Sequence, residues 1–327
     1  MTFRTEVHTP ESPVKIELSS PIVSLGSCFA DTMGQRLQHL KLTTLNNPFG
    51  IIYNPLSILS LVNKCLKDTD EIYFPEEGFL EREGRWYHDA LHTTINATSK
   101  EGLTTRINAL TQQVSKALKA ANWLIITPGT AHVYEYQKDD RLVANCHKLP
   151  GTNFKRRMLD VTEITEAFQQ TYQLLKYINP KVRILLTVSP VRHIRDTIPV
   201  NTISKSTLLL ASHYLRQTLE DVHYFPSYEL MIDDLRDYRF YKRDMIHPSE
   251  EAEDYIWSKF SQAFFSAELQ TFEKQWDKIL KSLQHRPFNP ASDQHQAFLH
   301  KLLTQLENLA SKIDVEQEIQ QVKQQLI

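Results

Sequence analysis

The sequence predicts an α/β protein in which helices cover a mostly parallel sheet. Short apolar runs rich in branched residues alternate with longer segments of helical periodicity, and this alternation is typical of parallel sheets wrapped by helices. The runs are Ile22 to Leu25, Trp123 to Thr127 and Val182 to Val188, and each leads into a segment rich in Gly, Ser, Pro or Thr. Ligands of open α/β sheets bind beyond the carboxyl ends of the strands. These three strand ends are therefore where a functional site is expected.

Helices are expected between the strands. Apolar residues recur at helical spacing in residues 55–66, 105–121, 162–177, 204–219 and 249–264. Residues 72–94, in which Gly78 and Gly84 stand among aromatic and charged residues, favour a β-hairpin insertion instead. We expect this hairpin to form a wall over the site.

The end of the chain has a different composition. From about residue 266 it is rich in Gln, Lys and Leu, and Pro287 and Pro290 interrupt what otherwise looks like two long helices. We therefore expect a catalytic domain over residues 1–264 and a helical extension over residues 265–327. An apolar stripe runs along the extension through Leu302, Leu303, Leu306, Leu309, Ile313, Ile319, Val322 and Leu326. Packing of the stripe on its own chain is favoured, and the alternative is a seam between the subunits of a homo-oligomer.

Composition and charge exclude several classes of function. The chain has 327 residues, a formal net charge of -2 and 23% charged residues, which gives no field strong enough to recruit nucleic acid. Its cysteines, Cys28, Cys65 and Cys146, form no CxxC pair and indicate a reducing compartment. The first thirty residues contain charges and prolines where a secretory signal needs an apolar stretch, and no segment is apolar enough to span a membrane. These features predict a soluble, cytoplasmic protein.

Ser27 is the candidate nucleophile. It belongs to a Gly-Ser pair that directly follows the first apolar strand and precedes a helical pattern. A serine at such a turn can face the crevice while the amides that open the next helix point to the same place, so that nucleophile and oxyanion donors come from one short element. The alternative is that Ser27 only caps the helix that begins near Asp31.

The partners expected for Ser27 are Asp244 and His247. A hydroxyl becomes nucleophilic at neutral pH when an imidazole takes its proton, and a carboxylate improves that imidazole by fixing its tautomer. The Asp-x-x-His spacing can place both groups on one turn. Pro248 and Ser249 look like the start of a helix, so the pair is expected on the loop before it. The alternative is a solvent-exposed loop with an incidental histidine.

The residues that carry these motifs resemble a known family. GSCFA at residues 26–30 is the name-giving motif of the GSCFA-domain proteins, which are placed in the SGNH/GDSL hydrolase superfamily. The similarity continues through residues 47–50, 128–131, 145–148, 189–191, 204–206 and 224–229 to Asp244-x-x-His247, and so spans roughly residues 1 to 262. The resemblance implies a three-layer, flavodoxin-like SGNH-hydrolase fold and a catalytic triad of Ser27, Asp244 and His247.

The family plan also implies an oxyanion hole made by a glycine amide and an asparagine side chain. Gly50 is the candidate for the glycine. At the expected asparagine position, after Gly129 and Thr130, this chain has Ala131. The missing donor is expected from Asn46, Asn47, Thr130 or His132, because losing one such donor costs roughly a hundred- to a thousandfold in rate. Gly50, Asn47, Gly129, Thr130 and His132 are thus the expected oxyanion and substrate-binding residues.

Other nucleophiles and ligands are weaker candidates. Cys28 is intrinsically more nucleophilic than serine, but it is expected to pack into the core. Lys205 and Ser206 are adjacent near the start of a predicted helix, where their side chains diverge, so a Ser/Lys dyad is disfavoured.

Histidines and aromatic residues elsewhere have several interpretations. His88, Asp89 and His92 have ligand-like spacing, but the segment reads as a hairpin and no metal site is predicted. Arg192 or His193, after the third strand, could contact an anionic substrate group or only form the turn. A further set of aromatic residues could line an acyl or sugar pocket, although core packing is favoured for most of them: Tyr224, Tyr228, Tyr238, Phe240 and Tyr241.

Together these features predict a serine esterase or acyl-transferase that acts on a small acyl ester, with an O-acetylated carbohydrate as one such substrate. The predicted mechanism needs no metal or organic cofactor. The alternative, suggested by Ala131 in place of asparagine, is a binding module that keeps the fold but has little or no catalytic activity.

Overall fold

A five-stranded parallel sheet forms the centre of the computed structural model, which describes residues 4–67 and 74–327. Its strands are β1 (Ile22–Gly26), β2 (Thr44–Asn46), β5 (Trp123–Thr127), β9 (Arg183–Leu186) and β10 (Val222–Tyr224), in the order β2-β1-β5-β9-β10. The predicted α/β class with a mostly parallel sheet is confirmed. Taken in chain order, the strands follow the doubly wound order 2-1-3-4-5, whose switch point lies between β1 and β5.

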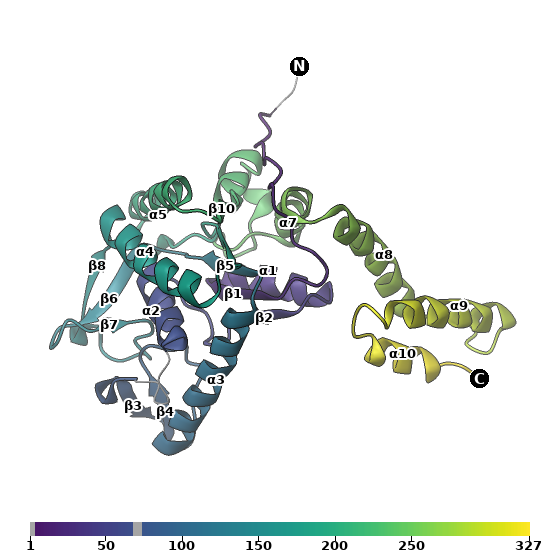
Figure 1. Ribbon diagram of the computed structural model, residues 1–327, viewed down its shortest axis with the longest axis horizontal. Coiled ribbons are helices and arrows are strands. Elements are labelled where there is room, and N and C mark those ends of the chain that lie inside the picture. The colour runs from purple at the N-terminus through teal and green to yellow at the C-terminus, as the bar shows by residue number, and fades with distance from the viewer. Residues whose placement is uncertain (1–3, 68–73) are drawn as a thin grey trace.

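Helices cover both faces of this sheet (Figure 1). Alternate residues of a strand point to opposite faces, and the two core clusters follow that rule. Ile22, Trp123 and Ile125 pack in one cluster, whereas Val23 and Leu124 pack in the other. The first cluster is completed by α1 (Cys28–His39) and α7 (Glu250–Phe264), and the second by α2 (Pro55–Leu66), α3 (Lys100–Ala120) and α4 (Val161–Ile178).

The predicted helices are present. The largest difference between an expected and an observed helix start is at α5 (Ile198–Thr218), which was expected to begin at residue 204. Lys205 is consequently inside a helix and buried, not near the helix start. The third predicted strand is shorter than expected because its last residues, Thr187 and Val188, continue as loop. A short helix, α6 (Ser227–Glu229), follows β10.

Two small antiparallel sheets are inserted into the domain. The predicted hairpin is confirmed over the described residues 74–94 as β3 (Phe79–Arg82) and β4 (Arg85–His88), while residues 72–73 lie outside the described part of the chain. Its turn residues Glu83 and Gly84 both have positive φ, 52° and 71°, as a two-residue hairpin turn of type I′ requires. The second sheet, not predicted, joins β6 (His132–Tyr136), β7 (Leu142–Val143) and β8 (Phe154–Met158).

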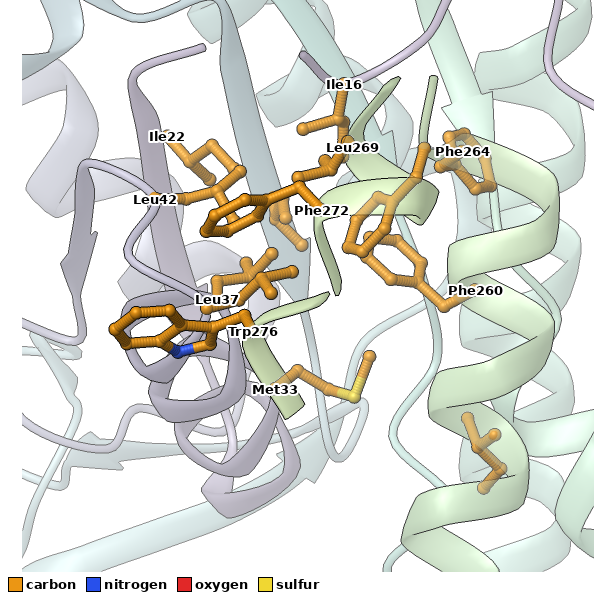
Figure 2. Packing of buried hydrophobic residues seen from close by; sticks show 14 of the residues in the cluster. Ile16, Ile22, Met33, Leu37, Leu42, Phe260, Phe264, Leu269, Phe272 and Trp276 are labelled. Carbon is orange, nitrogen blue, oxygen red and sulfur yellow. The ribbon is translucent and has the colours of Figure 1, made fainter. Parts of the chain in front are cut away.

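The end of the chain forms α8 (Ala267–Leu283), α9 (Asp293–Leu309) and α10 (Glu316–Lys323), which lead away from the sheet (Figure 1). Figure 2 shows Leu269, Phe272 and Trp276 of α8 packed beside Leu37 and Leu42, and the Trp276 indole donates to the carbonyl of His39 at 2.8 Å.

The apolar stripe of the extension packs within its own chain, as favoured. Leu302, Leu306, Leu309, Ile313 and Val322 are buried in the cluster that α8 shares with the sheet domain. Within residues 4–67 and 74–327 there is no helix with the length and apolar character needed to cross a bilayer.

Candidate active site

Ser27 occupies the sharp bend between β1 and α1, next to the switch point of the sheet. Gly26 has a φ of +147°, and a Cβ on it would lie 2.3 Å from the carbonyl oxygen of Thr127 in the neighbouring strand. Only glycine fits this conformation and this close approach. The Ser27 amide then donates to the same Thr127 carbonyl at 3.0 Å, which fixes the serine at the carboxyl end of the sheet.

The hydroxyl of Ser27 is buried and uncommitted. Ser27 is at the N-cap position of α1, but its side chain makes no capping hydrogen bond. The residue is 0% exposed, and Oγ has no hydrogen-bond partner among the residues that the structure describes. A buried hydroxyl without a partner is costly, and the absence of a capping bond shows that helix capping is not what Ser27 does in this structure.

His193 faces Ser27 across a glycine. A Cβ added to Gly129 would lie 3.3 Å from Ser27 Cβ and 3.0 Å from His193 Nε2. The ring of Tyr53 closes the same space and makes an edge contact with the His193 ring, with centroids 5.4 Å apart. Because Gly129 has no side chain, the serine and an imidazole can both pack closely against it. We expected His193 only as a possible anion contact or part of a turn, and its position just after the third strand was the one signal that could have placed it here.

Asp244 and His247 form the pair that their spacing predicts, on the loop before α7. Asp244 Oδ1 accepts from the amides of Ile246 and His247, at 2.8 and 3.0 Å, and Oδ2 lies 2.7 Å from His247 Nδ1. The hydrogen bonds from the His247 amide, the His247 ring and the Ile246 amide lower the pKa of Asp244 to about 2. The ionised carboxylate holds the proton on Nδ1, which leaves Nε2 with a lone pair to act as a base.

The expected contact between Ser27 and His247 is not formed in this structure. Ser27 Oγ has no hydrogen-bond partner within residues 4–67 and 74–327, and the His247 side chain is 39% exposed. The loop of Asp244 and His247 is held instead to the loop after β9, where the Arg192 amide donates to Ile246 O and the Arg192 guanidinium donates to Met245 O, each at 3.2 Å. Catalytic hydrogen bonds are often long without substrate and tighten in the substrate complex.

The amide of Gly50, which we expected to be an oxyanion donor, is already engaged in a hydrogen bond in this structure. It donates to Asn47 O at 2.8 Å, closing a tight turn in which Gly50 has a φ of +76°. Asn47 fits the role better. Its Oδ1 accepts from the Gly26 amide at 2.8 Å, which fixes the orientation of the side-chain amide, and its buried Nδ2 has no acceptor among the described residues. This donor is thus held beside the bend that carries Ser27.

The other expected oxyanion residues are engaged elsewhere. The Gly129 amide donates to Tyr53 O at 2.7 Å, and Thr130 Oγ1 lies 3.1 Å from Ser204 Oγ and accepts from the His132 amide. Ala131 is buried in an apolar cluster with Val133. Asn46, in turn, donates to the carbonyl and the carboxylate of Asp31.

Lys205 is a buried cation at the same edge of the sheet. Its Nζ donates to the carbonyls of Gly129 and Ser189, each at 2.6 Å, and so ties together the loops that follow β5 and β9. Burial lowers the pKa of Lys205 to about 7. Lys205 thus holds the two strand ends together from inside α5, whereas we expected it near the start of a helix.

Cys28 is half-buried and packs against the cluster of α1 and α7, so it is less enclosed than expected. Burial raises the pKa of its thiol, and hydrogen bonds from the amides of Phe29 and Cys28 itself oppose that shift. A raised pKa keeps the thiol protonated at neutral pH, which makes it a poor nucleophile.

The histidines around the hairpin bond to protein groups. His88 Nε2 lies 3.1 Å from Pro75 O, His147 Nε2 lies 2.9 Å from His88 O, and Asp89 pairs with Arg141. Burial lowers the pKa of His88 to about 4 and raises that of Asp89 to about 6. In the described part of the chain no three His, Cys, Asp or Glu side chains gather in a way that could hold a metal ion.

Comparison with protein families gives two matches. The model of the GSCFA family matches residues 21–260, and that of the C-terminal domain of GSCFA domain proteins matches residues 276–327. Comparison with curated proteins gave no match. The first match covers more than half of the chain and includes Ser27, Asp244 and His247. This chain therefore belongs to the GSCFA family.

Proposed function

We propose that the protein is a serine esterase or acyl-transferase of the SGNH-hydrolase type, with a flavodoxin-like catalytic domain. The uncommitted hydroxyl of Ser27 carries this proposal. It lies at a helix N-terminus beside the switch point of the sheet, it caps nothing, and it has an imidazole across Gly129. The Asp244–His247 pair adds an activated base on a neighbouring loop.

The proposed reaction proceeds through an acyl-enzyme. Ser27 Oγ attacks the carbonyl carbon of the ester while its proton passes to His247 Nε2, with Asp244 stabilising the imidazolium. The alcohol then leaves with that proton, and water or a second alcohol takes up the acyl group in the reverse sequence. The first amides of α1 and Nδ2 of Asn47 stabilise the oxyanion. For this step, the loop of His247 has to close on Ser27 when substrate binds.

The substrate class that fits this chemistry is a small acyl ester, such as an O-acetyl group on a carbohydrate. Hydrolysis of short aryl esters provides the assay. Ser27→Ala and His247→Ala should lower kcat by about a thousandfold or more, because each removes a group that acts on the reacting atoms.

Two matched controls separate chemistry from folding. Ser24→Ala removes another buried hydroxyl that has no partner among the described residues, from the strand that leads to Ser27, and His213→Ala removes an exposed histidine of α5. Both should retain the wild-type rate. If the Ser27 and His247 variants hydrolyse esters as fast as these controls, the proposed roles are wrong.

A non-catalytic binding module is the second candidate, favoured by the missing bond between Ser27 and His247 and by Ala131 in the core. A fluorophosphonate probe distinguishes the two. Stoichiometric labelling that is lost in Ser27→Ala supports the esterase. A folded protein whose Ser27 remains unlabelled supports the binding module, and labelling lost only in Cys28→Ala would assign the nucleophile to the thiol.

A further inference from the structure

A cavity of about 500 Å³ lies at the connection between α8 and α9, outside the catalytic domain. Its walls include His285 and Arg286 after α8, and Ser292, His295 and Phe298 at the start of α9. Pockets that bind small molecules have volumes of about 300 to 1,000 Å³. The cavity is thus large enough for a small ligand, and it lies entirely within the region matched by the C-terminal family model.

The charge of the walls favours an anion. No Asp or Glu is among the described residues that line the cavity, whereas Arg286 is exposed and makes no ion pair within the described part of the chain. The helix α9 begins in the wall, with Ser292 as its N-cap. The amino-terminal end of a helix attracts negative charge, but Asp293 in the first turn of α9 already supplies one, so Arg286 is the main attraction for an anion in this wall.

His295 supplies a hydrogen-bonding group that the protein does not use. The residue is 7% exposed and lines the cavity, and its Nε2 is buried without a partner among the described residues. A buried ring nitrogen without a partner is costly. An anionic oxygen of a ligand would accept a hydrogen bond from Nε2–H and so satisfy this nitrogen.

Aromatic rings form another part of the wall. His295 stacks on Phe298 with ring centroids 5.9 Å apart, and His285 lies 5.6 Å from the Phe298 ring. Phe288, in the same wall, is fully exposed. Exposed aromatic surface next to a cation is suited to a ligand that combines a flat apolar body with a charged group.

We propose that this cavity is a binding site for a small organic anion, in which a carboxylate or phosphate contacts Arg286 and His295 while an attached ring packs on His285 and Phe298. The site is separate from the proposed active site, and its occupancy does not depend on the esterase chemistry. It gives the C-terminal helices a ligand-binding role of their own.

Titration of the full chain with four probes, followed by ligand-observed NMR, tests the site. Phenyl phosphate and benzoate carry both features, inorganic phosphate lacks the ring, and benzyl alcohol lacks the charge. We expect saturable binding of at least one ring anion, with inorganic phosphate and benzyl alcohol each weaker by about tenfold or more, because each probe lacks one of the two proposed contacts. The two ring anions together show which charged group is preferred.

Variants link the binding to the named residues. Arg286→Gln and His295→Phe should each weaken binding of the ring anion by about tenfold. The surface changes Lys301→Gln and His300→Gln on α9 should leave it within about twofold, as expected of surface changes away from the site. Arg286 is exposed and has no ion pair among the described residues, so its variant stays informative even if His295→Phe fails to fold. No saturable binding of either ring anion, equal binding of inorganic phosphate or benzyl alcohol, or binding that is unchanged in Arg286→Gln would overturn the proposal.

Discussion

Replacement of Lys205 by methionine should destabilise the α/β domain strongly. The lysine is 1% exposed, and its Nζ is hydrogen-bonded to the carbonyls of Gly129 and Ser189, which are both buried residues. Methionine preserves the length and apolar stem of the side chain but donates to neither oxygen. Each buried acceptor left unpaired costs about 1 to 3 kcal/mol, so Lys205→Met should lower the free energy of unfolding by about 2 to 6 kcal/mol.

Urea denaturation of both proteins at one pH measures this loss. Lys281→Met serves as the control, because Lys281 is exposed on α8 and should change the stability by about 0.5 kcal/mol or less. The slope of the free energy against urea should be the same in all three proteins. If Lys205→Met unfolds at the same urea concentration as the control, the carbonyls of Gly129 and Ser189 find other hydrogen-bond donors, and Lys205 is not what holds the two strand ends together.

The same pair of proteins should differ in pH dependence. Burial lowers the pKa of Lys205 to about 7, below the value in the unfolded chain, so between these two values the unfolded chain binds the additional proton. The stability difference between wild type and Lys205→Met should therefore grow as the pH rises from about 7 to about 9, by at most about 1.4 kcal/mol per pH unit. The two carbonyls stabilise the charged amine and reduce this slope. A difference that shrinks over this range would contradict the direction.

Three further changes test the geometry of the site. Asn47→Asp keeps the acceptor for the Gly26 amide but removes the Nδ2 donor. The kcat for aryl esters should therefore fall by about a hundred- to a thousandfold, with little change in KM. An unchanged kcat would exclude Asn47 from the oxyanion hole. Asp244→Asn should lower kcat by a similar or larger factor, and full activity of this variant would refute the pairing. Because the pKa of Asp244 is lowered to about 2, protonation of this carboxylate should cause no loss of wild-type activity above about pH 4. Gly26→Ala should cost at least about 2 kcal/mol of stability, because the new Cβ would collide with Thr127 O and the backbone has a positive φ there. The control is Gly151→Ala, whose Cβ would have no atom within 4 Å and which should leave the melting temperature unchanged. Equal melting temperatures for the two variants would mean that the bend at Gly26 relaxes.

Local patterns were sufficient for the main frame of the fold. The apolar run at Trp123 to Thr127 became β5 with the same bounds, and residues 55–66 became α2 with the same bounds. The first is a continuous apolar run that is buried on both faces of the sheet, and the second is a twelve-residue helical pattern, so tertiary packing agrees with both. The strands β2 and β10 have three residues each, too few for any period to emerge. Most of β8 is exposed, so its residues include the charged run Lys155, Arg156 and Arg157 and lack the apolar pattern that predicts a strand.

For the site, sequence reasoning located the elements but not their contacts. The contact between Asp244 and His247 is local, three residues apart, and follows from the spacing. The position of His193 beside Ser27 depends on how the loops after β1, β5 and β9 pack, which no local pattern encodes. The same holds for Gly50, whose amide is taken by a turn that only the backbone path reveals.

The most direct test of Ser27 as the nucleophile is to trap its acyl-enzyme. The protein is mixed with an aryl acetate, quenched with acid during turnover, and digested, and the peptide that contains Ser27 and Cys28 is examined by mass spectrometry. We predict one acetyl group on Ser27, still present in Cys28→Ala and resistant to neutral hydroxylamine as an oxygen ester is. Turnover in which this peptide carries no acetyl group, or an acetyl group that disappears in Cys28→Ala but persists in Ser27→Ala, would contradict the assignment.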